Sequence, residues 1–251
     1  MKRLEIIGLE NIGEVRQGES IAGLIVEASA REHVTLTSGD IVVVAHKIVS
    51  KAEGRIVHLA EVRPSARALE LARELNKDAR LLEIILTESR RIVRQGDGTI
   101  IVETHHGFIC ANGGVDLSNV GPGLAALLPR DPDRSAREIG DGIRRLSGAA
   151  PAVIISDSFG RPWRLGTVDV AVGVSGLRPL TDDRGKQDRH GYELRASVAA
   201  VADELAAAAE LVMGKRGEIP VVVIRGAALA REEGSVKELL RPEAEDLFRN
   251  F

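Results

Sequence analysis

The fold is decided by the stretch AVIISDSFGRPWRLGT, residues 152–167, in which four apolar residues run directly into two serines, an aspartate, glycines and arginines. Its first part, Ala152–Ile155, has the length and composition of a buried strand. Similar apolar runs at Asp40–Ala45 and Val221–Ile224 predict two more buried strands, and Val168–Val174 predicts another directly after the quoted stretch. We therefore expect a sheet of buried strands that projects polar residues from strand ends.

Helix-like patterns alternate with these strands. Apolar residues recur with the helical period, and Ser or Asp stands where an N-cap is expected. From this alternation the chain is α/β or α+β, and the strand order is not deducible. The expected helices are Ile21–Ala30 after Ser20, one after Ser65, one after Asp78, one from Asp133 or Ser135 to about Leu146, Glu193–Met213, and two short C-terminal helices. Shorter strands are expected at Leu4–Ile7, Arg91–Arg94, Thr99–Glu103 and Phe108–Cys110.

Composition bounds the class of protein. The 251 residues include 44% hydrophobic and 28% charged side chains, which is ordinary for a soluble globular protein. The net charge of −3 gives no global attraction to nucleic acid or to anionic membranes. No signal peptide or apolar span is recognisable, and the single Cys110 excludes an intrachain disulfide. We expect a cytoplasmic protein with one domain over residues 1–251, or two intimate subdomains, and no nucleic-acid or membrane partner.

Several familiar motifs are absent. Gly13–Ser20 has the glycine spacing of a phosphate-binding P-loop, but Glu19 stands where that motif needs lysine, and an acid there would repel the phosphates. No Gly-x-Gly-x-x-Gly follows a strand, and neither a Gly-x-Ser-x-Gly elbow nor a His-Glu-x-x-His pair is present. His105 and His106 are adjacent, so at most one would face a site on a strand.

A second polar stretch, HHGFICANGGVDLSN, spans residues 105–119. The chain has only six aromatic residues, and Phe108, Phe159 and Trp163 lie in the two quoted stretches. Aromatics beside acids, amides and paired glycines favour the lining of a polar ligand. The alternative is that Phe108 and Phe159 are strand ends packing inward. Cys110 is expected to be a small buried residue.

The acids of these stretches suit metal-assisted phosphoryl chemistry. Hard cations such as Mg²⁺ or Mn²⁺ prefer carboxylate and hydroxyl oxygens, which Asp116, Asp157 and Ser158 could supply. Asn119 can donate to a phosphate or a base. The pair Gly113-Gly114 would allow the backbone amides to approach a charged ligand closely.

Basic residues complete the constellation. The segment His46–Arg55 follows the Asp40–Ala45 run, and its Lys51 could neutralise phosphate charge. For Lys47 a solvated basic turn is the favoured interpretation. Arg161 could grip an anionic substrate beside an aromatic face, and a surface arginine pair with Arg164 is the alternative.

Together these motifs resemble one family. Gly8-Leu9, His46–Arg55, Ala111–Asn119 and Ser156–Thr167 are similar to the coenzyme F420-0:L-glutamate ligases, and the similarity spans nearly the whole chain. The resemblance implies GTP-dependent γ-glutamyl ligation of L-glutamate onto the deazaflavin precursor F420-0, with Mg²⁺ or Mn²⁺ and a monovalent cation, K⁺. It also implies an unusual α+β fold and an intertwined homodimer with nucleotide sites between protomers.

The resemblance also implies residue roles. Asp116, Asp157 and Ser158 match metal ligands, and Asp116, Asp157 and Arg161 are the expected catalytic residues. The segment MGKRGEIP, residues 213–220, departs from the family pattern, with Lys215 replacing a glutamine and Glu218 as the candidate acidic metal ligand. The expected nucleotide contacts are Gly8, Leu9, Glu10, Asn11, His46, Lys47, Lys51, Asn119 and Lys215.

The sequence is compatible with three functions. A ligase would phosphorylate the precursor carboxylate with GTP and let the glutamate amine attack the acyl phosphate, which requires no side-chain nucleophile. A metal-dependent phosphatase or nucleotide hydrolase would use the same acids with water. A non-catalytic nucleotide-binding protein would have lost its metal through the altered Lys215–Glu218 segment.

Overall fold

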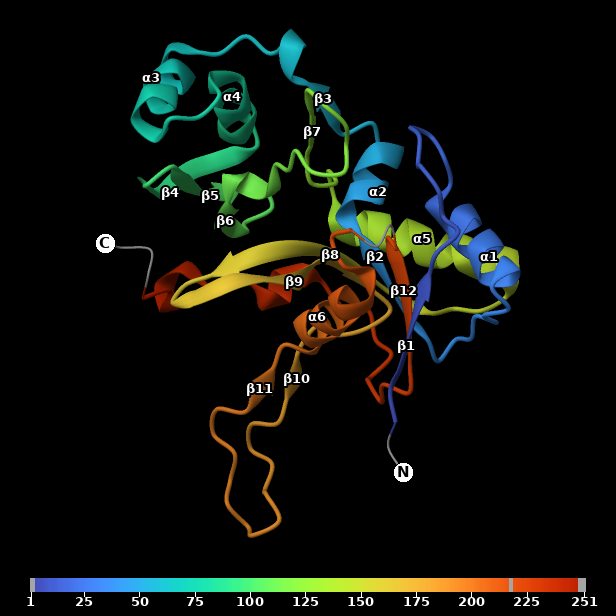
Figure 1. The fold of residues 1–251 in the computed structure, drawn as a ribbon. Coiled ribbons are helices and arrows are strands. Elements are labelled where there is room, and N and C mark those ends of the chain that lie inside the picture. Colours follow the sequence, from blue (N-terminus) through green and yellow to red (C-terminus); the bar gives the residue numbers. More distant parts are fainter. Residues whose placement is uncertain (1–2, 217–218, 248–251) are drawn as a thin grey trace.

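The centre of the protein is a five-stranded mixed sheet. The computed structural model describes residues 3–216 and 219–247. Strands β2 and β8 are parallel and every other neighbouring pair is antiparallel. All the main buried strands expected from the sequence are confirmed, and the structure supplies their order (Figure 1). That order is β1 (Glu5–Leu9), β12 (Val221–Arg225), β2 (Ile41–Ala45), β8 (Ala152–Arg161) and β9 (Arg164–Ser175).

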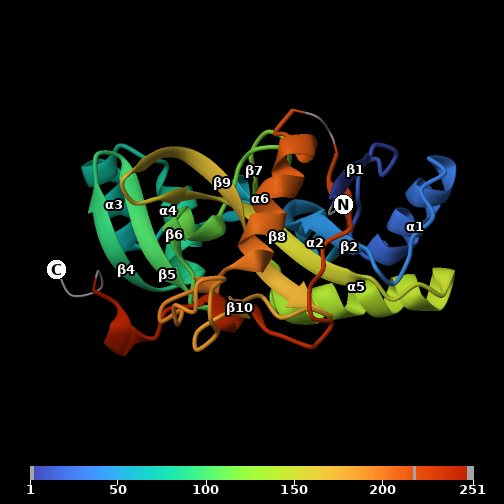
Figure 2. The same cartoon turned by 90° about the horizontal axis from the view of Figure 1, so that it is seen from below.

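Helices cover both faces of this sheet. Helices α1 (Ile21–Arg31) and α5 (Pro132–Ser147) pack on one face, where Val42 and Val44 point. Helix α6 (Val201–Met213) covers the other face, and Figure 2 shows it lying across β8 and β9. Because side chains alternate along a strand, the apolar run of β2 supplies both cores. This two-sided burial explains why its sequence is continuously apolar.

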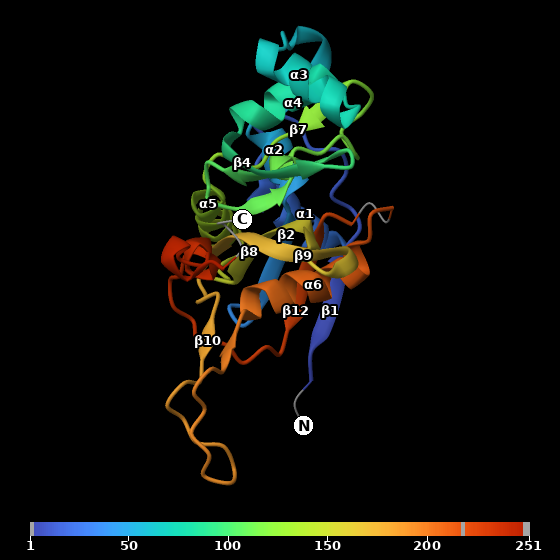
Figure 3. The ribbon, with the colours of Figure 1, turned by 90° about the vertical axis from the view of Figure 1, so that its left-hand side faces the viewer.

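A second lobe has its own apolar core, built where two helices cover a small antiparallel sheet. Its helices begin at the predicted caps, since the Ser65 and Asp78 side chains accept from backbone amides of the first turns. Figure 3 shows this lobe at one end of the molecule. The lobe contains α3 (Ala66–Leu75), α4 (Ala79–Thr87), β4 (Ser89–Gly96), β5 (Thr99–Thr104) and β6 (Ile109–Ala111), and the pair β3 (Ile56–His58) and β7 (Leu124–Ala126) connects it to the main sheet. The fold is therefore α+β, as the resemblance implies.

The long helix predicted over Glu193–Met213 is wrong in its first part. Residues 181–199 form an arm that projects from the body in Figures 1 and 3, with β10 (Thr181–Asp182) paired to β11 (Val198–Ala199). Leu194 N donates to Lys186 O at 2.8 Å, so this backbone satisfies itself across the arm instead of along a helix. Alanine-rich composition indicated a helix, and long-range pairing overrode it.

Three further local expectations are corrected. Residues 156–167 form a β-hairpin because β8 continues to Arg161 and turns into β9. Helix α5 is capped by Asp131, two residues before the predicted Asp133. The segment after β2 is a short helix, α2 (His46–Ala52), and not a turn. The short 3-10 helices are η1 (Leu59–Glu61), η2 (Asn112–Gly114), η3 (Val236–Leu239) and η4 (Glu243–Glu245), and the last two are the expected C-terminal helices. Among the described helices, none has the length and apolar character to cross a bilayer.

Candidate functional site

A cavity of about 970 Å³ lies where β2 ends, and we call it the large cavity. Its walls come from five segments that are distant in sequence: residues 10–14, residues 45–51, residues 119–121, the β8–β9 ribbon, and residues 210–216 with 219–220. The parallel pairing of β2 with β8 places Ala45 beside Ser156, so both strands deliver polar residues to this edge. Several predicted site residues therefore meet in one place: Glu10, His46, Lys47, Lys51, Asn119, Asp157, Ser158 and Lys215.

Helix α2 presents two of the basic side chains of the large cavity, Lys47 and Lys51. Ser50 Oγ donates to Leu127 O at 2.6 Å, which anchors the helix to the chain beyond β7. Lys47 and Lys51 lie four residues apart, so they share one face of the helix. Their side chains are only 19% and 13% exposed. The prediction that Lys47 lies in a solvated turn is therefore wrong. Partly buried ammonium groups in a cavity are suited to anionic ligands.

Each of these lysines is held by a carboxylate. Lys47 Nζ lies 2.7 Å from Asp116 Oδ2 and 2.8 Å from Ser118 Oγ. Lys51 Nζ lies 2.7 Å from Glu14 Oε1, a largely exposed partner in the loop after β1. An anionic ligand in the large cavity would compete with both carboxylates for the ammonium groups.

Asp116 stands behind Lys47 and does not itself line the large cavity. Its carboxylate accepts from Ser118 N at 2.8 Å and from Ser118 Oγ at 3.0 Å. Burial alone would raise the pKa of Asp116, but the hydrogen bonds from Lys47 and Ser118 outweigh it and hold the pKa below its ordinary value. Asp116 is therefore a carboxylate at neutral pH that orients Lys47.

Asp157 reaches the large cavity from within β8. Its Oδ1 accepts from Ser158 N at 2.7 Å and lies 3.2 Å from His46 Nε2. The His46 contact has the distance of an ion pair but not the direction of a hydrogen bond, and both buried ring nitrogens lack a hydrogen-bond partner among the described residues. We treat the contact as electrostatic proximity, since hydrogen bonds weaken steeply with misalignment. A buried imidazole with free nitrogens beside a carboxylate is a polar group that a ligand or water can satisfy.

The aromatic residues do not line this cavity. Phe108 is buried in the main core, where it stacks on His106 and meets Phe159 edge to face at 6.3 Å. The expectation that Phe108 and Phe159 face a polar ligand is therefore wrong, and inward packing is what the structure shows. Cys110 is buried beside them, as expected, and burial followed by the charge of Asp157 raises the pKa of its thiol to about 12. A thiol protonated at neutral pH is not a nucleophile.

Two glycines that were expected to let the backbone approach a ligand are explained by close packing within the fold. Gly114 has a φ of +70°, and a Cβ there would lie 2.7 Å from the Leu128 side chain. A Cβ on Gly8 would lie 2.8 Å from Val212, so this glycine lets α6 pack against β1. Leu9 is fully buried in the core. Of the predicted Gly8–Asn11 contacts, only Glu10 lines the large cavity.

The turn after β1 is ordered by a carboxylate from α1's C-terminal end. Glu32 Oε1 accepts from Glu10 N at 2.8 Å, from Asn11 N at 3.0 Å and from Asn11 Nδ2 at 3.1 Å. This places the Asn11 side chain on Glu32 and not in the large cavity. The turn nevertheless carries Gly13 and Glu14 to the cavity rim.

The opposite rim comes from the segment after α6. Asn119 Nδ2 donates to Lys215 O at 3.3 Å, which joins two predicted contacts that are 96 residues apart. Arg216 lines the large cavity beside Lys215, although no sequence motif indicated a role for it. The predicted metal ligand Glu218 lies outside the described residues.

Arg161 lies at the far end of the β8–β9 hairpin. Its Nη2 donates to Leu165 O at 3.5 Å, and its Nη1 is buried without a hydrogen-bond partner in the described part of the chain. Trp163 and Leu165, at the hairpin turn, are 82% and 100% exposed. The structure does not bring Arg161 to the large cavity of its own chain.

The cavity wall also contains a carboxylate that was not expected from the sequence. Asp169 on β9 is 6% exposed and accepts hydrogen bonds from Ser156 and Ser158 of β8. A signal was present, because Asp169 is the only charged residue in the apolar run Val168–Val174. A lone acid in a buried strand is unusual unless it is paired or functional.

The large cavity is compatible with a divalent cation. Across residues 3–216 and 219–247, no three His, Cys, Asp or Glu side chains converge into a ready-made metal site. Mg²⁺ typically keeps several waters and uses one or two carboxylates together with substrate phosphates. Asp157 and Ser158 line the same cavity as three lysines, so the donor set fits a cation that enters with a phosphate ligand.

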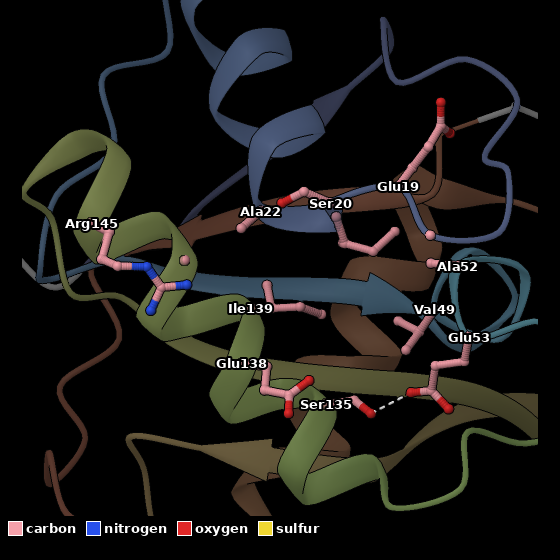
Figure 4. Close-up of a pocket in the computed structure, with 13 residues that line it drawn as sticks. Glu19, Ser20, Ala22, Val49, Ala52, Glu53, Ser135, Glu138, Ile139 and Arg145 are labelled. Carbon is pink, nitrogen blue, oxygen red and sulfur yellow. Dashed lines mark hydrogen bonds between the residues drawn. The ribbon is translucent and has the colours of Figure 1, made fainter.

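A second, smaller cavity of about 290 Å³ lies on the other side of α2 and is shown in Figure 4. Its walls are the start of α1, the end of α2 and one face of α5. Glu53 accepts from Ser135 Oγ at 2.5 Å and from Arg130 N at 3.0 Å. None of the predicted site residues lines this small cavity.

Comparison with known proteins gives one consistent family. The sequence model of F420-0:Gamma-glutamyl ligase matches residues 10–226. The chain is 50% identical to the coenzyme F420:L-glutamate ligase of Methanothermobacter thermautotrophicus, covering 98% of this chain and 99% of the relative. Relatives of the same name from Methanocaldococcus jannaschii and Archaeoglobus fulgidus are 44% and 41% identical, with 97% or more of both chains covered.

Proposed function

Because the chain belongs to the F420-0:gamma-glutamyl ligase family, we propose that it is a ligase that adds L-glutamate by γ-linkage to coenzyme F420-0 in coenzyme F420 biosynthesis. The observation that carries the proposal is the large cavity, which is lined both by Lys47 and Lys51 and by acids of the β8–β9 ribbon, Asp157 and Asp169. Ligation of this kind needs a nucleotide triphosphate held beside an acceptor carboxylate, and the cavity combines cationic side chains with oxygen donors in a partly buried space.

The proposed co-substrate is GTP, and the proposed intermediate is an acyl phosphate. An oxygen of the acceptor carboxylate attacks the γ-phosphorus, and the bond from that phosphorus to the bridging oxygen breaks to release GDP. The glutamate amine then attacks the acyl carbon, inorganic phosphate leaves, and the amine loses a proton. Lys47 and Lys51 hold the phosphates once these displace the carboxylates of Asp116 and Glu14. Such positioning and charge stabilisation supply most of the catalysis in phosphoryl transfer.

Asp157, Ser158 and the released carboxylate of Asp116 would hold Mg²⁺ or Mn²⁺ with the nucleotide. When bound, the cation neutralises phosphate charge. The proposed monovalent cation is K⁺, which the resemblance implies. The buried His46 ring lies beside this divalent cation site, with Nε2 3.2 Å from Asp157 Oδ1.

We also propose that the active form is a homodimer. The β8–β9 hairpin ends in the exposed Trp163 and Leu165, and the 181–199 arm carries the exposed Tyr192. Exposed apolar side chains on projecting segments are typical of protein–protein contacts. In such a dimer, Arg161 at the end of the hairpin would reach the large cavity of the partner and contact the anionic ligand bound there. Sedimentation of the protein at assay concentration tests this, and an active monomer would contradict it.

One incubation tests the ligase proposal. The protein is mixed with GTP, Mg²⁺, L-glutamate and F420-0, and GDP release and product mass are followed. Glutamate-dependent GDP release with a product heavier by glutamyl units is the expected result. Glutamate-independent release would indicate a nucleotide hydrolase, and no release would indicate a binding protein. The Asp157→Asn variant is the control for contaminating activity.

A further inference from the structure

Asp169 on β9 accepts hydrogen bonds from two serines of the neighbouring strand. Ser158 Oγ lies 2.6 Å from Asp169 Oδ1, and Ser156 Oγ lies 2.9 Å from Asp169 Oδ2. The antiparallel register places Ser158 directly opposite Asp169, and Ser156 follows two residues away on the same face. All three residues line the large cavity.

The burial of Asp169 contrasts with that of a structural carboxylate in the same sheet. Asp40, at the start of β2, is buried and lies 2.9 Å from Arg225 Nε. Asp169 is also buried, yet the described residues offer no cationic nitrogen within ion-pair distance of it. A buried carboxylate without a cation is costly unless hydrogen bonds and a ligand compensate it. The compensation that the structure shows is the pair of serine hydroxyls.

These hydrogen bonds fix the direction in which the Ser158 hydroxyl points its proton. A serine hydroxyl carries one proton and two lone pairs, and a carboxylate oxygen only accepts. The 2.6 Å distance is that of a charge-assisted O–H···O bond, so the Ser158 proton is committed to Asp169. Ser158 is only partly buried, whereas Ser156 is 1% exposed. The atom that Ser158 offers to the large cavity is therefore an oxygen with lone pairs and no proton.

We propose that Asp169 is a positioning residue that makes Ser158 Oγ a cation ligand. An oxygen without a free proton attracts a cation and does not donate to a phosphate oxygen. The inference rests on the proposed function, because it assigns this oxygen to the divalent cation that enters with the nucleotide. It adds to that function a residue on β9, away from the quoted motifs, which acts through Ser158 rather than by touching the ligand.

The test measures Mn²⁺ affinity in the presence of a non-hydrolysable GTP analogue, with free Mn²⁺ followed by electron paramagnetic resonance. Asp169→Asn is nearly isosteric and removes the charge that orders the hydroxyls. We expect a loss of roughly 10- to 100-fold in Mn²⁺ affinity, which is typical for partners of a metal ligand. Asp203→Asn is the matched control, because Asp203 also contacts β9, accepting from Ala171 N at 2.9 Å, but does not line the large cavity.

A double-mutant cycle separates positioning from direct binding. If Asp169 acts through Ser158, then Asp169→Asn added to Ser158→Ala lowers Mn²⁺ affinity little further. Fully additive losses, or wild-type affinity in a folded Asp169→Asn protein, overturn the inference while leaving the proposed function intact. If the wild-type protein itself binds no Mn²⁺ with the analogue, the proposed metal requirement fails and this inference fails with it. Thermal melting checks folding, and Asp169→Ser replaces Asp169→Asn if that variant does not fold.

Discussion

The two cavities on either side of α2 differ in how their charges are satisfied. Lys51 faces the large cavity and Glu53, two residues later, faces the small one. Glu53 has both carboxylate oxygens in hydrogen bonds with neighbouring parts of the fold. In the large cavity, as far as the described residues show, neither ring nitrogen of His46 has a hydrogen-bond partner, and Asp169 has only hydroxyl partners.

The difference separates a structural surface from a binding surface. In the small cavity, the exposed Glu138 is paired locally, since Arg134 lies 2.8 Å from it, four residues along the same helix. Such exposed pairs contribute little to the free energy of unfolding, and their charges need no ligand. In the large cavity, the lysine partners are carboxylates that an anion can displace, and buried polar atoms remain unsatisfied. A ligand there gains interactions that the protein has not already made for itself.

The largest expected effect comes from Asp157→Asn. We expect a loss of roughly 100-fold or more in kcat/KM, or about 2.7 kcal/mol, because the amide cannot replace a carboxylate in a site that balances phosphate charge. Steady-state GDP release at saturating Mg²⁺ measures it, and circular dichroism verifies the fold. Wild-type activity at ordinary metal concentration would remove Asp157 from the site, and the same criterion applies to Asp116→Asn.

Removal of Lys51, the most buried lysine of the large cavity, is expected to weaken nucleotide binding. Lys51→Ala loses a charge-assisted contact of about 1.5–3 kcal/mol, which weakens nucleotide binding roughly 10- to over 100-fold. The loss should be equal for GTP and ITP, because an ammonium that contacts phosphate does not distinguish bases. Calorimetric titration of both nucleotides measures it, with exposed Lys237→Ala as control. If Lys51→Ala binds GTP as tightly as the wild type, the phosphate assignment is wrong.

A smaller effect of opposite sign is expected for Glu14→Gln. Glu14 competes with an anionic ligand for Lys51, and exposed ion pairs contribute about 0.2–1 kcal/mol. Removing its charge should therefore tighten GTP binding by roughly 1.5- to 5-fold. In the Lys51→Ala background the gain should disappear, and a gain that persists there would show that Glu14 acts by another route.

Substitutions in the small cavity should have the smallest effects. Glu138→Gln and Arg145→Ala change exposed side chains of α5. We expect GTP affinity and turnover to stay within about twofold, and the free energy of unfolding within about 0.5 kcal/mol. The assays are those used for Asp157→Asn and Lys51→Ala. A large loss of activity would mean that the small cavity also takes part in function, and the contrast between the two cavities would no longer hold.

Most strands and helix starts were predictable because they depend on local chemistry. Ser20, Ser65 and Asp78 cap helices that begin at the next residue, and the β2 run is continuously apolar. The prediction failed where long-range pairing decides, as in the segment from Glu193 to Ala200, whose alanine content indicated a helix. The candidate site divides in the same way. His46, Lys51 and Asp157 line one cavity as expected, whereas Asp169 lies outside every motif that was quoted.

By itself, the sequence determined the family resemblance, the buried strands and the residue types available for phosphate and metal chemistry, since these depend on composition and spacing along the chain. Only the tertiary structure decided which of those residues share a cavity. Asn119 meets Lys215 and Lys47 meets Asp116 across long sequence separations, because strand order and the position of α2 bring them together. The direction of the Ser158 hydroxyl proton was likewise decided by its partner on the facing strand, Asp169. Hydrogen-bond direction depends on three-dimensional neighbours, which local sequence does not specify.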